Sequence, residues 1–168
     1  MPAPVLEEAA QAVGNYDNSG LSILEMSHRS KPLVAMLEEA RQLVKDLLDL
    51  SDDYEVLYLT GGASSQFYMT AMNLLQPAQT AAYIDTGAWS TKAIKEASLF
   101  GNVEMIASSK AQNYNYIPKE WTLPMDSRYL HITSNNTIYG TQYAAFPVVD
   151  AMMVADMSSD FYSRAFDV

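Results

Sequence analysis

The sequence predicts an α/β domain built on a mainly parallel sheet that is flanked by helices. Apolar runs of strand length recur along the chain, amphipathic segments of helical length lie between them, and small or polar residues follow each apolar run. Continuous apolar runs are typical of strands buried on both faces, which is the usual state of a parallel sheet. Ligands bind beyond the carboxyl ends of such strands, so the polar residues that follow them are the candidate site.

Composition limits the class of protein. The chain has 168 residues, of which 49% are hydrophobic and 18% charged, and this is enough for one folded domain. A net charge of −10 argues against a nucleic-acid partner. Without cysteine there is no disulfide and no thiolate ligand, and we predict no metal centre. The sequence shows neither a signal peptide nor a membrane-spanning run, so we expect a cytoplasmic protein with no membrane partner.

The N-terminal third is predicted to be helical. Apolar spacing indicates a short helix at Leu6–Val13 and a longer one at Pro32–Leu48, with Ser30 as its N-terminal cap. Residues 14–20 are rich in turn formers, and residues 21–30 are expected to be irregular or extended.

The middle of the chain predicts a strand, a turn and a helix. Tyr54–Thr60 is apolar with aromatic and β-branched members, Gly61–Ser65 supplies small residues, and Gln66–Leu75 has helical spacing. A helix that begins after such a turn directs free N–H groups toward an anion. The turn matches neither the P-loop nor the dinucleotide-binding fingerprint.

The remainder continues the alternation of strands and helices. The expected elements are strands at Thr80–Ile84, Val103–Ala107, Tyr129–Thr133 and Met152–Ala155, with a helix at Ala88–Phe100. Two prolines interrupt Ser108–Arg128, which is therefore predicted to be a connection, and Ser134–Gln142 is predicted to be a loop.

The polar segments after the strands should share one edge of the sheet. They are Gly61–Ser65, Asp85–Trp89, His131–Thr137 and Asp156–Ser159. A carboxylate at Asp156 serves a cationic ligand, a helix cap or a salt bridge, and Trp89 serves either as a stacking surface or as a core residue. Together, an anion-binding turn, an aromatic plate and a carboxylate suit a planar cationic heterocycle that carries a phosphate.

Six segments carry a resemblance to a known family. They are Ser27–Ser30, Gly61–Phe67, Tyr83–Trp89, Asn113–Pro118, Ser134–Gln142 and Val154–Asp160. In this order they resemble the phosphoserine aminotransferases of the class-V aminotransferase group. The resemblance implies pyridoxal 5′-phosphate bound to the large domain of a fold-type I homodimer. It also implies amino transfer from glutamate to 3-phosphohydroxypyruvate, which yields phosphoserine and 2-oxoglutarate in serine biosynthesis.

The resemblance also implies roles for individual residues. The implied cofactor-binding residues are Ala63, Ser64, Trp89, Thr137, Asp156 and Ser158. Backbone N–H groups of Ala63 and Ser64 would bind the cofactor phosphate, and Trp89 would stack on the ring. Thr137 would contact the ring oxygen, and Asp156 would pair with the ring nitrogen. His28 and Arg29 would contact the substrate's phosphate or carboxylate, although a solvated loop pair is the simpler interpretation of these two residues alone.

The chain departs from the family pattern in two ways. Some members have an arginine where Ser64 stands, so the substrate must be held by other cations. The family's Schiff-base lysine is expected beyond Val168, as are the rest of the large domain and the small domain. The lysines present, Lys31, Lys45, Lys92, Lys95, Lys110 and Lys119, do not end a predicted strand. We therefore expect residues 1–168 to be an N-terminal portion that is inactive alone and has no catalytic lysine of its own.

Other functions remain open at this point. The chain is alternatively a non-catalytic fragment or assembly partner, or part of another class-V aminotransferase or a desulfurase-like relative. Ser27–Ser30 and the Asn113–Tyr116 segment favour the phosphoserine branch. The sequence does not decide whether the phosphorylated substrate of vitamin B6 (pyridoxine) synthesis is also used.

Overall fold

The computed structural model describes residues 1–166 and 168. It divides into two compact units, one formed by Met1–Tyr58 with Val168 and the other by Leu59–Phe166. The polar segments that the sequence predicts to share one edge all belong to the second unit. Within the described part of the chain, no helix is long and apolar enough to cross a membrane.

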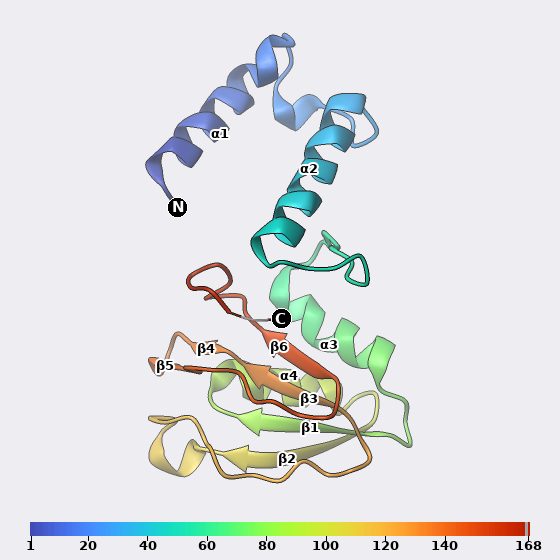
Figure 1. The fold of residues 1–168 in the computed structure, drawn as a ribbon, viewed down its shortest axis with the longest axis vertical. Helices are drawn as coiled ribbons and strands as arrows, with labels where there is room; N and C mark the ends of the chain where they lie inside the picture. Colours follow the sequence, from blue (N-terminus) through green and yellow to red (C-terminus); the bar gives the residue numbers. More distant parts are fainter. Residues whose placement is uncertain (167) are drawn as a thin grey trace. The chain divides into compact units, whose positions relative to one another are not determined.

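The first unit contains the two predicted helices. They are α1 (Ala3–Asn15) and α2 (Lys31–Leu47), and the 3-10 turns η1 (Tyr16–Asn18) and η2 (Ile23–Glu25) lie between them (Figure 1). Ser30 occupies the N-cap position of α2, but its hydroxyl makes no capping hydrogen bond, so the predicted side-chain cap is wrong. Pro32 at the second helical position has no N–H, which removes one of the two donors that a capping hydroxyl reaches.

The strand predicted at Tyr54–Thr60 is not formed. These residues have no strand partner, and several of their apolar side chains are exposed, Leu57 to 69%. A β-strand requires a neighbour for its backbone hydrogen bonds, so an apolar run without one remains irregular. The helix after it begins earlier than predicted, because Gly62 already belongs to α3 (Gly62–Leu74).

A four-stranded parallel sheet forms the centre of the second unit. Its strands lie in the order β2 (Asn102–Ser108), β1 (Thr80–Asp85), β3 (Ser127–Thr133) and β6 (Met153–Asp156) (Figure 1). All four were predicted. The register pairs Thr133 with Asp156, so the carboxyl ends of β3 and β6 lie side by side.

The predicted loop at 134–142 contains a small antiparallel pair. Strands β4 (Asn135–Asn136) and β5 (Thr141–Gln142) pair with each other, and the backbone of Tyr139 and Gly140 bonds back to Asn136. Strands of two residues carry no periodic signal in a sequence, so pattern analysis could not find them.

The two faces of the sheet are covered differently. Helix α3 and helix α4 (Ala88–Ala97) pack on one face around an apolar cluster of Phe67, Ala71, Leu75, Ala81, Tyr83, Ala93, Ala97 and Tyr129. Alternate strand residues, including Ile84 and Ile132, face the other side, where irregular segments such as 117–123 and 143–149 cover them. The connection predicted at Ser108–Arg128, which includes the short turn η3 (Lys110–Gln112), therefore contributes to the core.

Candidate functional site

One cavity gathers most of the residues predicted to bind a ligand. Its volume is about 310 Å³, at the small end of the range for small-molecule sites. The lining residues are Gly61, Gly62, Ala63, Ser64, Phe67, Trp89, Asn135, Thr137, Asp156, Ser158 and Ser159. They include all six predicted cofactor-binding residues and come from each of the four polar segments. The edge of the sheet predicted from the sequence is therefore present.

The N-terminus of α3 forms one wall of the cavity. Gly61 precedes the helix at φ 102°, and a Cβ there would lie 2.5 Å from the Ser65 hydroxyl oxygen, so the turn requires glycine. The first turn contains no acidic residue and no side chain caps it. The free N–H groups at Ala63 and Ser64 therefore face the cavity region with a partial positive charge, which favours an anion.

Trp89 supplies the aromatic wall. Its side chain is 39% exposed, which excludes the interpretation that it is a core tryptophan. Its indole Nε1 donates to Thr137 Oγ1 at 3.4 Å, so the two predicted residues contact each other in the lining of the cavity. The ring face stays available for stacking on a planar ligand.

Asp156 supplies a carboxylate to the same cavity. Its Oδ1 accepts hydrogen bonds from the N–H and the hydroxyl of Ser158, which is a local turn rather than a helix cap. Among residues 1–166 and 168, Asp156 has no ion-pair partner and its Oδ2 has no hydrogen-bond donor. One carboxylate oxygen is therefore available to a ligand.

Asp85 organises the turn that carries Trp89. Its buried carboxylate accepts hydrogen bonds from four hydroxyl groups at 2.9–3.0 Å, which belong to Ser90, Thr91, Ser108 and Tyr114. Ser90 in turn accepts from the N–H groups of Thr86 and Gly87. The network fixes the start of α4 and therefore the position of Trp89.

His131 lies in the interior near Asp156. It lines a smaller cavity of about 200 Å³ that also includes Asp156. The imidazole stacks on Tyr83 with ring centroids 4.7 Å apart, and its buried Nδ1 has no hydrogen-bond partner among the described residues. Burial lowers the pKa of His131 to about 4, a shift that the charge of Asp156 partly offsets, so the ring is neutral at pH 7.

Lys92 contacts a residue of the site, and the sequence analysis did not identify this role. Its Nζ donates to Ser64 Oγ at 2.8 Å, from the helix that also carries Trp89. The spacing of three residues puts Trp89 and Lys92 on one face of α4, and this spacing is the signal that could have found it.

His28 and Arg29, the two predicted substrate contacts, belong to the first unit. Both are exposed there, and Arg29 Nε donates to His28 Nε2 at 3.3 Å.

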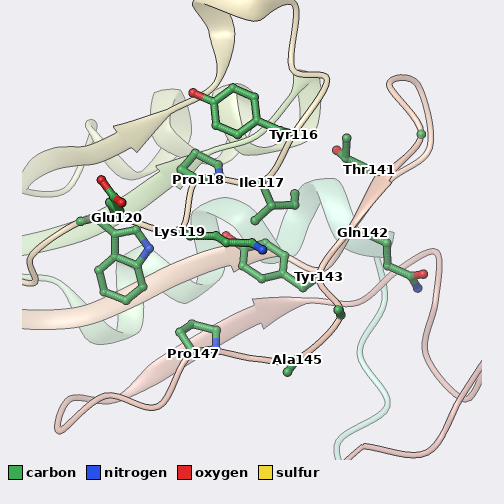
Figure 2. Close-up of a pocket in the computed structure, with 13 residues that line it drawn as sticks. Tyr116, Ile117, Pro118, Lys119, Glu120, Thr141, Gln142, Tyr143, Ala145 and Pro147 are labelled. Carbon is green, nitrogen blue, oxygen red and sulfur yellow. The ribbon is translucent and has the colours of Figure 1, made fainter.

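A larger cavity of about 1120 Å³ lies elsewhere in the second unit. Residues 116–121, 140–145 and 147 line it, and Figure 2 shows Tyr116 and Pro118 on one side with Ala145 and Pro147 opposite. It contains none of the predicted site residues and no helix N-terminus. Volume alone would select this cavity as the ligand site. The helix N-terminus, the aromatic ring and the carboxylate expected of a site for a phosphorylated heterocycle line the 310 Å³ cavity instead.

Known sequences resemble the chain over its whole length. The family model described as aminotransferase class-V matches residues 1–168. The phosphoserine aminotransferase of Flavobacterium psychrophilum is 53% identical over 168 residues, and that of Bacillus subtilis is 48% identical over 169. These alignments cover 99% and 100% of this chain and 47% of each relative, so the chain spans about half the length of the relatives it matches.

Solved structures give the same result. A phosphoserine aminotransferase from Bacillus circulans subsp. alkalophilus matches 99% of this chain and 47% of its own, with a TM-score of 0.94 and 46% identity. A pyridoxal-phosphate-bound phosphoserine aminotransferase from Trichomonas vaginalis matches the same shares, with a TM-score of 0.89 and 33% identity. These matches confirm the predicted fold class. The chain belongs to the class-V aminotransferase family.

Proposed function

We propose that the full-length polypeptide containing this chain is a phosphoserine aminotransferase. It would transfer an amino group from glutamate to 3-phosphohydroxypyruvate, giving phosphoserine and 2-oxoglutarate in serine biosynthesis. The observation that carries the proposal is the polarity of the 310 Å³ cavity, which has a helix N-terminus in one wall and the carboxylate of Asp156 in another. The similarity to named phosphoserine aminotransferases supports it.

The residues of the cavity fit pyridoxal phosphate. Backbone N–H groups of Ala63 and Ser64 would bind its phosphate, the face of Trp89 would hold its ring, and Thr137 would contact its ring oxygen. The free oxygen of Asp156 would accept a hydrogen bond from the protonated ring nitrogen, while Ser158 holds the other oxygen in place. The bound cofactor would supply an electron-withdrawing ring, and the Asp156 carboxylate would support this chemistry by favouring the protonated ring nitrogen.

The proposal extends to the setting of the site. His28 and Arg29 would contact the substrate's phosphate or carboxylate, since a guanidinium forms a fork of donors suited to both. Residues 1–168 would be a portion of the cofactor-binding large domain of a cytoplasmic homodimer. Use of the vitamin B6 pathway substrate is a further proposal for the same site.

An amino-transfer assay of the full-length polypeptide tests this function. With pyridoxal phosphate and glutamate present, we expect 3-phosphohydroxypyruvate to be converted to phosphoserine, with 2-oxoglutarate formed in equal amount. Unphosphorylated hydroxypyruvate serves as the matched acceptor and should react at least about 10-fold less efficiently, because it leaves the phosphate-binding groups unpaired. Equal use of both acceptors would favour another class-V aminotransferase, and absence of turnover with bound cofactor would favour a non-catalytic protein.

A further inference from the structure

A cation from a second helix contacts one of the residues that line the cavity. Lys92 reaches from α4 to the first turn of α3, where its Nζ donates to the hydroxyl oxygen of Ser64 at 2.8 Å. Ser64 lines the cavity, so the ammonium group lies one side chain away from the ligand space. This contact places a full positive charge beside the partial positive charge of the helix N-terminus.

We propose that Lys92 is a specificity-determining residue that binds the phosphate monoester dianion of a ligand in this cavity. The inference rests on the proposed function. It adds a positive charge at the phosphate-binding turn, where Ser64 itself is uncharged. The phosphate belongs either to the cofactor or to the phosphorylated substrate, and the two sources share the same chemistry.

The ammonium group has capacity left for a ligand. Within residues 1–166 and 168, Lys92 forms no ion pair, although the chain has a net charge of −10. Its hydrogen bond to Ser64 uses one of three N–H donors. Most lysines of the described chain form no ion pair either, so the distinguishing observation is the contact of Lys92 with a hydroxyl that lines the ligand cavity.

Ser64 is suited to work with Lys92. Because its oxygen accepts from the ammonium group, its own O–H is free to donate, and its backbone N–H lies in the first turn of α3. A phosphate oxygen at this point would meet a backbone donor, a hydroxyl donor and a cation. Charge-assisted bonds of this kind are about twice as strong as neutral ones, and the phosphate dianion is the most highly charged group in either ligand.

Replacing Lys92 with glutamine in the full-length polypeptide tests the inference. Lys95→Gln, one turn further along α4, is the control because it is exposed and removes the same charge from the same helix. Affinity of the cofactor-free protein is measured for pyridoxal phosphate and for pyridoxal, which lacks the phosphate. KM is measured for 3-phosphohydroxypyruvate and for glutamate.

Each source of the phosphate predicts a different result. If Lys92 binds the cofactor phosphate, Lys92→Gln weakens pyridoxal phosphate binding about 10- to 100-fold and leaves pyridoxal binding unchanged. If it binds the substrate phosphate, KM for 3-phosphohydroxypyruvate rises by a similar factor while cofactor affinity and KM for glutamate stay constant. Adding Ser64→Arg to Lys92→Gln should restore part of the lost affinity, since the guanidinium brings a cation to the same turn.

Two outcomes would overturn the inference. If Lys92→Gln matches Lys95→Gln in both affinities and both KM values, Lys92 is an ordinary surface lysine, while the proposed function stands on the wild-type activity. If the wild-type protein binds neither pyridoxal phosphate nor the phosphorylated substrate, the proposed function fails as well.

Discussion

Replacing Asp156 with asparagine is expected to lower kcat/KM for amino transfer at least about 100-fold in the full-length polypeptide. Asp156 lines the cavity with one carboxylate oxygen held by Ser158 and the other without a partner among the described residues. The asparagine amide has nearly the same shape but no charge, so it cannot favour the protonated ring nitrogen. The ring would then withdraw electrons poorly, although the helix N-terminus would still bind the phosphate.

The matched control for this substitution is Asp126→Asn. Asp126 is exposed just before β3 and lines none of the cavities described above, so its replacement should leave kcat/KM within about 2-fold of wild type. A titration with pyridoxal phosphate accompanies the rate measurement. Loss of rate with binding retained supports the assignment, whereas an Asp156→Asn enzyme with near wild-type kcat/KM would contradict it.

Acidification is expected to destabilise the protein through His131. The pKa of His131 falls from an ordinary value of 6.5 to about 4 in the folded state because the ring is buried. Between these two values the unfolded chain takes up a proton that the folded chain does not, so the free energy of unfolding decreases as the pH falls. The contribution of His131 to the free energy of unfolding is fully present above about pH 6.5. Its loss lowers the free energy of unfolding by about 2 kcal/mol at pH 5.

A comparison of two histidine variants isolates this effect. His131→Phe keeps a ring against Tyr83 and cannot titrate, whereas His28→Gln removes the exposed histidine of the other unit. Urea unfolding midpoints at pH 7.5 and pH 5 should move less in His131→Phe than in wild type, and His28→Gln should follow wild type. Equal losses in all three proteins would show that His131 does not carry the pH dependence.

The sequence predicted the paired strands of the sheet and the helices. All four strands of the sheet and helices α1 to α4 were found from apolar runs and apolar periodicity, although α1 and α2 contain no buried residue. The strand predicted at Tyr54–Thr60 failed because an apolar run specifies a strand only when a neighbour completes its hydrogen bonds. The division of the described chain into two units was not visible either, since no change of composition marks Tyr58.

The site residues that could be predicted are those that follow a strand directly in the sequence, because the carboxyl ends of parallel strands meet at one edge of the sheet. That rule, with the family resemblance, led to Ala63, Trp89 and Asp156, which the fold brings to one cavity. The rule could not find Lys92, which lies in the body of a helix and reaches Ser64 in the cavity wall through one long side chain. Nor could it show that Asp85 holds the turn of α4 through four hydroxyl groups, because those hydroxyls come from three separate segments.

The central claim is that the 310 Å³ cavity binds pyridoxal phosphate. The two tryptophans of this chain test it directly, since Trp89 lines the 310 Å³ cavity and Trp121 lines the 1120 Å³ cavity. The measurement is the dissociation constant of pyridoxal phosphate for full-length Trp89→Leu and Trp121→Leu proteins. We expect about a 10-fold weaker affinity in Trp89→Leu, from the loss of ring stacking, and no change in Trp121→Leu. Weaker binding in Trp121→Leu with unchanged binding in Trp89→Leu would place the cofactor in the larger cavity and contradict the assignment.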